Sequence, residues 1–242
     1  MKKLYRVKSK MRPSAFLAAA ALLASAFFGA AFPVGNARAE ESATHLYKIQ
    51  GYDNESGAPI IAGINVYDFG AEGDGAADDT DAFERAFQYV VTSPSGGGIV
   101  YVPAGKYLLT RPIVVPEGVC LRGQWNDPTG KNKKPESVLL CKPAESQAHI
   151  PMLRLSEKAA VKGMSFYYPD QKIGNVAEYG ATVSVLGHGV GIEDLTLYNS
   201  YIGIVTGISL SAGSEVTVSR VYGTALKQAV LIDWDLNGSQ IT

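Results

Sequence analysis

The sequence has little cysteine: Cys120 and Cys141 are its only two in 242 residues. A chain with so few cysteines is not held together by a framework of disulfides, so a hydrophobic core has to supply its stability. The sequence also lacks a second long apolar run after its N-terminal segment, which leaves no candidate for a further membrane-spanning helix.

The N-terminal segment, residues 1–39, differs from the rest of the chain. Six basic residues fall within the first twelve positions, and an apolar run rich in Ala and Leu follows. Ala37 and Ala39 flank Arg38 with the small-residue spacing of a signal peptidase site. We therefore predict a secretory signal peptide over residues 1–39, cleaved after Ala39, and a secreted protein without a stable membrane span. An uncleaved membrane anchor is the alternative.

The rest of the chain is short of positive charge. The whole sequence has 22 basic and 23 acidic residues, of which residues 1–39 hold seven basic and no acidic ones. Residues 40–242 therefore carry 15 basic against 23 acidic residues, a net charge of −8. This charge does not favour nucleic acid or anionic lipid as a partner. It also opposes anionic sugars, unless a local basic cleft or a bridging cation intervenes.

Glycine, by contrast, is abundant, with 26 residues in 242. Short runs of Val, Ile, Leu and Tyr lie between the glycines, a pattern typical of many short strands joined by tight turns. Residues 40–63 contain the turn sequence "YDNESGAP" and form a lead-in segment. Residues 64–242 are long enough for one sizeable core and form the main domain.

The stretch "DFGAEGDGAADDTDAFERAF", residues 68–87, is rich in acidic residues and glycine, and two interpretations compete. A calcium loop of the EF-hand type needs oxygen ligands at alternate positions, but Asp74 is followed two positions later by Ala76. The segment Asp78-Asp79-Thr80 instead has the chemistry of a helix cap, with Thr80 able to cap the N-terminus. We interpret the stretch as the start of an amphipathic helix from about Asp81 to Val91, rather than as a metal site. Its apolar face is Ala82, Phe83, Ala86, Phe87 and Val90.

Three later segments can be aligned with one another. They begin at Val161, Ile192 and Val216, so their starts are 31 (192 minus 161) and 24 (216 minus 192) residues apart. Each has an apolar residue at its sixth position and then a tyrosine, which is Tyr167, Tyr198 or Tyr222. Repeats of this length built from strands and glycines indicate a solenoid, in which like residues stack in rows about 4.8 Å apart. We predict that the three tyrosines form one outward row on neighbouring coils.

The two cysteines are 21 residues apart (141 minus 120), close to the length of one coil. Stacked on successive coils, they would lie within disulfide range. Two stacked, reduced and buried thiols are the alternative that we favour.

The stretch "DFGAEGDGAADDTDAFERAF", together with "GGGIVYVPAGKY" after it, resembles the N-terminal part of the pectate lyase superfamily domain. Rhamnogalacturonase-like, polygalacturonase-like and epimerase-like proteins share this domain, and the resemblance covers Ile64 to Arg122. It implies an all-β fold, a right-handed single-stranded parallel β-helix with an N-terminal capping α-helix. The acidic stretch would then belong to the cap.

The resemblance also implies a function. We expect a secreted carbohydrate-active protein that cleaves glycosidic bonds of a polysaccharide, one that can contain uronate, by hydrolysis or β-elimination. The alternative is a non-catalytic β-helix for glycan binding or cell-surface attachment. No cofactor is expected, apart from Ca²⁺ if the protein is a lyase. An outward row of Tyr167, Tyr198 and Tyr222 could bind the polysaccharide by stacking on sugar rings, and simple packing along the ladder is the alternative for these residues.

The family's catalytic groups are not evident in the sequence. Polygalacturonase-like members use clustered aspartates, a histidine and an Arg-Ile-Lys segment, and the strand region has neither the aspartate pair nor that segment. Lyases of this fold use carboxylates that bind Ca²⁺ and a basic residue. Glu193, Asp194 and Arg220 could approach one another across coils, although we favour ordinary turn charge for them. Metal ligands therefore stay unassigned.

The last segment, "LIDWDLNGSQIT", holds the candidate catalytic residues Asp233 and Asp235. Alternate positions of a strand point the same way, so the two carboxylates could share acid and base roles or hold a cation. A polar strand end is the alternative. No capping pattern follows the apolar run from Ala229 to Ile232. We expect the β-helix to be incomplete at this end, with a C-terminal continuation or a partner subunit covering the last coil.

Overall fold

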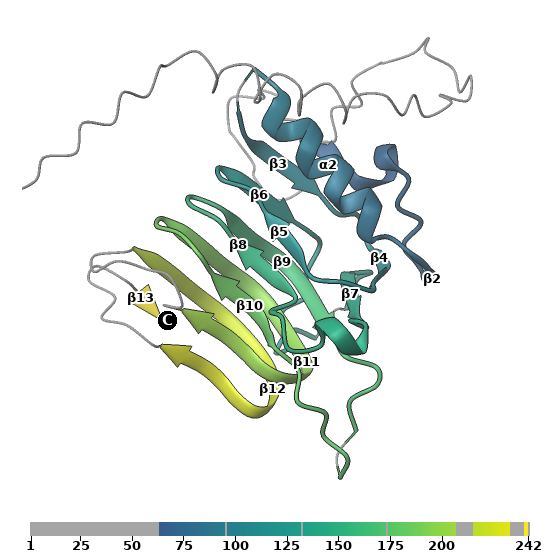
Figure 1. Ribbon diagram of the computed structural model, residues 1–242, viewed down its shortest axis with the longest axis vertical. Helices are drawn as coiled ribbons and strands as arrows, with labels where there is room; N and C mark the ends of the chain where they lie inside the picture. Colours follow the sequence, from purple (N-terminus) through teal and green to yellow (C-terminus); the bar gives the residue numbers. More distant parts are fainter. Residues whose placement is uncertain are drawn as a thin grey trace, which may run out of the picture. The chain divides into compact units, whose positions relative to one another are not determined.

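The strands of this protein stack on one another in parallel, one turn of the chain against the next (Figure 1). The computed structural model describes residues 63–94, 96–131, 133–172, 174–206, 215–232 and 240–241. The predicted signal peptide, almost all of the predicted lead-in segment and the candidates Asp233 and Asp235 lie outside these ranges. No helix in the described ranges has the length and apolar character needed to cross a membrane.

The stacked strands form three columns. The first column contains β1 (Ile64–Asn65), β3 (Gly98–Tyr101), β6 (Val119–Arg122), the first parts of β9 (Ala160–Tyr167), β11 (Val190–Thr206) and β12 (Val216–Ile232), and β13 (Gln240–Ile241). The second column contains β2 (Asp74–Asp78), β4 (Gly105–Leu109), β7 (Ser137–Cys141) and the middle parts of β9, β11 and β12. The third column contains β5 (Ile113–Val115), β8 (Leu153–Leu155), β10 (Ala181–Val185) and the last parts of β11 and β12.

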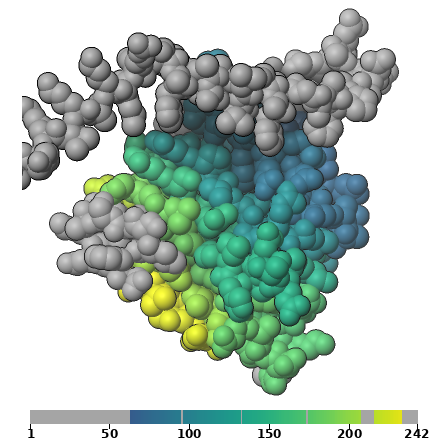
Figure 2. Space-filling view, in the orientation of Figure 1, coloured from purple at the N-terminus to yellow at the C-terminus, as the bar shows by residue number. Residues whose placement is uncertain are grey.

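This arrangement is the predicted right-handed single-stranded parallel β-helix, since connections between parallel strands almost always take the right hand. Figure 2 shows the coils in chain order, from blue at the N-terminal end to yellow at β12. Inward side chains stack in rows; in the second column one row is Tyr107, Leu139, Phe166 and Leu197. The first three are fully buried and Leu197 is 4% exposed. Burial of each such side chain contributes about 1.5–3 kcal/mol, so these rows hold the coils together.

Helix α2 (Thr80–Thr92) begins one residue before the predicted start and ends one residue after the predicted end. Phe83 and Phe87 are buried in the core cluster, as the apolar stripe predicts, and Phe83 meets the ring of Tyr107 edge-on at 5.6 Å. The helix lies at the N-terminal end of the stack (Figure 1) and contacts β1, β3, β5 and β6. This position agrees with the predicted cap.

The details of the helix cap differ from the prediction. Asp79, rather than Thr80, occupies the N-cap position, and it makes no side-chain capping bond. The carboxylate of Asp78 accepts from the Thr80 amide at 3.0 Å instead. The Thr80 hydroxyl donates to Asp78 and accepts from the Thr110 amide at 3.0 Å. Thr80 therefore links the helix to the next coil, a contact that no local pattern reveals.

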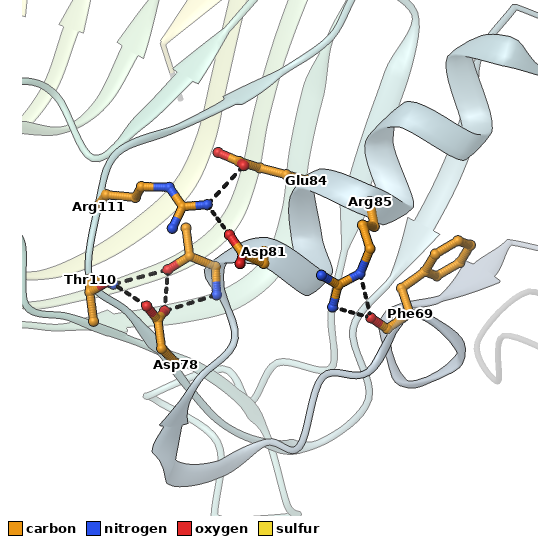
Figure 3. Close-up of polar contacts among 8 residues, drawn as sticks. Phe69, Asp78, Asp81, Glu84, Arg85, Thr110 and Arg111 are labelled. Atoms are coloured by element: carbon orange, nitrogen blue, oxygen red, sulfur yellow. Dashed lines mark hydrogen bonds and ion pairs between the residues drawn. The ribbon is translucent and has the colours of Figure 1, made fainter. Parts of the chain in front are cut away.

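The acidic residues of the stretch 68–87 help to hold this end of the stack together (Figure 3). Arg111 reaches from the next coil to form ion pairs with Asp81 and, at 2.9 Å, with Glu84. The hydroxyl of Thr110 donates to Asp78 at 2.6 Å. No group of three or more His, Cys, Asp or Glu side chains in the described part of the chain is arranged to hold a metal ion. The stretch thus forms a corner and starts a helix.

The predicted tyrosine row is correct for two coils and wrong for the third. Tyr167 lies opposite Tyr198, but Tyr222 lies opposite Thr196, two residues out of register. The coil from Ile192 to Val218 has 26 residues (218 minus 192), two more than the spacing of 24 in the sequence alignment. Because side chains alternate with a period of two, this shift keeps every inward residue inward, so the sequence pattern could not detect it.

The expected stacking of the cysteines is wrong. Cys120 lies in β6 and Cys141 in β7, which belong to the same coil and to different columns. The loop of residues 123–136 between the two strands supplies most of the 21 residues that suggested a full coil. Both thiols are free, and Cys141 is buried.

Candidate functional site

The outer face of the second column carries two rows of side chains, because residues alternate with the buried inward row. One row is Lys106, Val138, Ser165, Thr196 and Tyr222, and the other is Leu108, Leu140, Tyr167 and Tyr198. Tyr167 and Tyr198 are 36% and 42% exposed. The face therefore changes from aliphatic to aromatic toward the C-terminal coils, where two phenol rings stand in register.

A long loop, residues 123–136, leaves the chain between the first and second columns. Its base is closed by Gln124 and Ser137, since the Ser137 amide donates to the Gln124 carbonyl and the Gln124 amide donates to the Ser137 hydroxyl, both at 2.8 Å. Within the loop, the Lys134 amide donates to the Asn126 side chain at 2.9 Å. The backbone of the loop is thus fixed at its base and bridged within.

Trp125, near the start of this loop, lies over the outer face. Its indole Nε1 donates to the Thr196 hydroxyl at 2.8 Å, and its ring stacks on Tyr222 with centroids 5.9 Å apart. Thr196 is only 2% exposed as a result. One face of Tyr222 is covered by the indole, so Tyr222 supports Trp125, and the tyrosines that stand open are Tyr167 and Tyr198.

Glu136, at the end of the same loop, brings a carboxylate to the tyrosines. Its Oε2 accepts from the Ser165 hydroxyl at 3.3 Å. The pKa of Tyr198 is raised, first by partial burial and then by the negative charge of Glu136. The negative charge of Glu136 therefore acts on the phenol of Tyr198 and favours its neutral form.

The corner beside this face carries the charged candidates from the sequence. Gly163, Asp194 and Arg220 occupy equivalent positions on three coils and all have positive φ, at 72°, 56° and 50°. Asp194 and Arg220, which the sequence suggested could approach one another across coils, form an ion pair. Glu193 pairs instead with Lys162 at 2.9 Å. With a basic partner for each carboxylate, the group fits the interpretation as turn charge and does not fit a calcium site.

The tip of the loop is basic. Lys131, Lys133 and Lys134 are all exposed there, and the Lys133 ammonium donates to the Asp127 carbonyl at 2.9 Å. These three lysines form a local patch of positive charge in a chain that is acidic beyond residue 39. Such a concentration of positive charge lowers the electrostatic cost of bringing an anionic sugar to this part of the protein.

Two residues of this site, Trp125 and Glu136, were not predicted from the sequence. A signal existed for Trp125, because the sequence has only two tryptophans and this one stands in a polar segment, between Gln124 and Asn126. No signal existed for Glu136. Its position depends on how the loop folds back over the coils, and Asp233 and Asp235 lie beyond the described residues.

Comparisons with known proteins agree with the fold. Residues 63–139 match the family described as "Rhamnogalacturonase A/epimerase, pectate lyase-like". The chain is 43% identical over 58 residues to glucan 1,3-beta-glucosidase of Cochliobolus carbonum, and 54% identical over 43 residues to alginate lyase 7 of Azotobacter vinelandii. These alignments cover 21% and 18% of this chain, and only 7% and 5% of the two curated relatives.

Two solved structures are similar over a larger part of the chain. A putative glycosyl hydrolase from Parabacteroides merdae has a TM-score of 0.53 at 21% identity, covering 70% of this chain and 79% of that one. PfbA, a surface adhesin of Streptococcus pneumoniae, has a TM-score of 0.50 at 21% identity, covering 69% and 39%. At this identity the similarity establishes the fold, which an enzyme and an adhesin share.

Proposed function

Since the chain carries a pectate lyase-like parallel β-helix domain, we propose that it is a secreted carbohydrate-active protein that holds a polysaccharide on the outer face of the second column. The observation that carries the proposal is the pair Tyr167 and Tyr198, in register and exposed, with the carboxylate of Glu136 bound to Ser165 in the adjacent row. The flat apolar face of a phenol ring can pack against a sugar ring while its hydroxyl stays hydrated.

The spacing of the coils fits a chain-like ligand. Residues in one row of a parallel solenoid repeat about every 4.8 Å, so the two tyrosines present neighbouring contact points along the helix axis. The exposed Lys131, Lys133 and Lys134 lie on the loop that brings Trp125 and Glu136 to this face. They supply the positive charge that a uronate-containing chain needs on an otherwise acidic protein.

Glycosidic cleavage is the reaction that we propose for this face, by hydrolysis or β-elimination. Both reactions need a group that moves a proton at the bond, and Glu136 is our candidate for this role. Hydrolysis needs a second carboxylate. Asp233 and Asp235 stay the candidates for that role, and Ca²⁺ stays an expectation for a lyase only.

Glycan binding without cleavage is the second candidate function. It is favoured by the charge pairing around the face, where Glu136 is the one carboxylate that the described residues place against Ser165 and Tyr198. Asp194 and Glu193, at the adjacent corner, are bound to Arg220 and Lys162. Within the described residues, one carboxylate at this face is enough to hold a sugar chain, whereas hydrolysis needs a second one.

The test is polysaccharide binding by the secreted protein and by the double variant Tyr167→Ser/Tyr198→Ser. Affinity electrophoresis with polygalacturonate, alginate, xylan and β-glucan would measure binding. Tyr89→Ser is the matched control, because Tyr89 is an exposed tyrosine on α2. We expect the double variant to lose binding that the control keeps. Equal binding by a folded double variant would reject the tyrosine face as the binding site.

Product analysis separates the two candidate functions. Hydrolysis yields new reducing ends alone, whereas β-elimination also yields an unsaturated sugar that absorbs ultraviolet light. Binding to a polysaccharide with neither product, at any tested pH and with Ca²⁺ added, would support the binding role.

A further inference from the structure

A concave site lies at the corner between the second and third columns. It is a hollow of about 360 Å³ between residues 142–152, after β7, and residues 168–172 and 174–180, after β9, which project from the stack (Figure 1). Its polar lining is Glu145, His149, Glu178 and Tyr179, and Ala148 and Ala177 form apolar walls. We call this hollow the loop pocket. Its volume is at the lower end of the roughly 300–1,000 Å³ usual for small-ligand sites.

The walls of the loop pocket are fixed to one another. The Gly180 amide donates to the Ala148 carbonyl at 2.7 Å, and a Cβ on Gly180 would lie only 2.6 Å from the His149 carbonyl oxygen. The two segments therefore meet at a distance that only glycine permits. On the other wall, the buried side-chain amide of Gln171 donates to the Ala177 carbonyl at 2.8 Å and accepts from the Ala177 amide at 2.9 Å.

The acidic lining is also held in position. The hydroxyl of Tyr201, in β11, donates to Glu178 at 3.2 Å, and the ammonium of Lys227, in β12, lies 4.9 Å from the centre of the Tyr201 ring. Lys142 and Asp170 form an ion pair at 3.5 Å between the two segments. The pocket is thus built from several coils, whose side chains are joined by these contacts.

The lining chemistry indicates the ligand. Carboxylates such as Glu145 and Glu178 accept hydrogen bonds from hydroxyl groups, and the imidazole of His149 and the phenol of Tyr179 can donate or accept. The alanine walls can contact the C–H groups of a ring. Two carboxylates disfavour an anionic ligand. We propose that the loop pocket binds one uncharged sugar residue.

This inference deepens the proposed function and rests on it for the source of the sugar. The two segments leave the second column directly after Cys141 and Tyr167, so the loop pocket borders the face that carries the tyrosines. A polysaccharide on Tyr167 and Tyr198 would place a neutral branch or chain end in the loop pocket. The basic loop of residues 123–136 lies at the other edge of the face. That edge therefore favours anionic sugar residues, whereas the loop pocket disfavours them.

The experiment is an NMR titration of the uniformly ¹⁵N-labelled secreted protein with free D-glucose, D-galactose, D-xylose and D-glucuronate. We expect at least one neutral sugar to shift the amides of residues 143–149 and 177–180 saturably. Glucuronate differs from glucose by one carboxylate, and we expect it to bind about fivefold more weakly at low salt. Ala177→Trp, which fills the loop pocket from an exposed position, should abolish these shifts. Glu117→Gln, an exposed carboxylate at another corner, should leave them unchanged.

Three results would overturn the inference: no neutral sugar shifting these amides, tighter binding of glucuronate than of glucose, or unchanged shifts in Ala177→Trp. The variant Tyr167→Ser/Tyr198→Ser separates this inference from the proposed function. Loss of polysaccharide binding with intact monosaccharide binding in that variant supports both. If the protein binds a monosaccharide but no polysaccharide, the loop pocket is supported as a sugar site and the tyrosine face is rejected as a polysaccharide site.

Discussion

The indole of Trp125 lies on the ring of Tyr222, with the two ring planes inclined by 28° and their centroids 5.9 Å apart. The residues are 97 positions apart in the sequence (222 minus 125) and come from a loop and from the last long strand. This contact ties the loop of residues 123–136 to the C-terminal coils. It also decides which tyrosines of the outer face stay open to a ligand.

Replacement of Trp125 should lower stability. Trp125→Ala removes an aromatic pair and the hydrogen bond to Thr196, each worth about 1 kcal/mol, so we expect the free energy of unfolding to fall by about 2 kcal/mol. Trp125→Phe keeps a ring on Tyr222 and loses only the hydrogen bond, so it should cost about half as much. Chemical denaturation measures both. Equal losses in the two variants would contradict the stacking contribution.

Glu136 should matter for cleavage and not for binding. If the protein cleaves its polysaccharide, Glu136→Gln should reduce the rate about 100-fold or more, because the amide cannot move the proton. Binding should change little, since the amide still accepts from Ser165. The matched control is Glu193→Gln, whose carboxylate faces Lys162. A Glu136→Gln variant with full activity would place the chemistry elsewhere.

The cap of α2 should make stability depend on pH in the acid range. Burial acts to raise the pKa of Asp78, but hydrogen bonds from Thr110 and Thr80 outweigh it and hold the pKa below its ordinary value of 3.8. A lowered folded-state pKa gives stability that is present above the unfolded-state pKa and lost as the pH falls through the folded-state value. The stability that Asp78 contributes should therefore be lost at pH values below about 4.

Asp78→Asn tests this cap. We expect it to cost about 1 kcal/mol at pH 7, as the loss of a helix cap usually does, and to lose less additional stability between pH 4 and pH 2 than the unchanged protein. Denaturation at several pH values provides the comparison. The same pH dependence in both proteins would show that Asp78 does not contribute it.

Gly163 should tolerate no side chain, because of space as well as conformation. Its φ is 72°, and an added Cβ would lie 2.9 Å from the Gly123 carbonyl oxygen and 3.8 Å from the Cβ of Trp125. We expect Gly163→Ala to cost about 2–3 kcal/mol, from left-handed strain plus crowding. Gly96→Ala is the control, because its φ is 63° and no atom lies near its Cβ position. It should cost about 1 kcal/mol. Equal losses of stability in Gly163→Ala and Gly96→Ala would show that the backbone at Gly123 can move away from the added methyl group at little cost.

The cysteines should react slowly in the folded protein. Burial raises the pKa of the Cys141 thiol to about 12, and burial also raises the pKa of Cys120. Since the thiolate is the reactive form, a thiol reagent at pH 8 should label both thiols more slowly in the native state than after unfolding, and the buried Cys141 should be labelled more slowly than the partly buried Cys120. A reductant should leave the melting temperature unchanged. A fall in melting temperature with reductant would contradict the free thiols.

The sequence alone determined the fold class, the helix and the inward rows. Each depends on local pattern: the apolar stripe from Ala82 to Val90 has a helical period, and the strands of Phe166 and Leu197 alternate with a period of two. Such patterns also carried the resemblance over Ile64 to Arg122. The alternation cannot distinguish two registers that differ by an even number of residues. For this reason the sequence aligned Tyr222 with Tyr198, whereas its partner in the structure is Thr196.

Only the tertiary structure decided the composition of the site. The loop of residues 123–136 put Cys120 and Cys141 in one coil and carried Trp125 and Glu136 onto strands 30 to 100 residues further along the chain. The loop pocket likewise depends on the contact of Gly180 with Ala148 across two coils. A loop's own sequence has no periodicity that encodes where it packs. Its position follows from the surfaces that it meets, and these exist only once the coils have stacked.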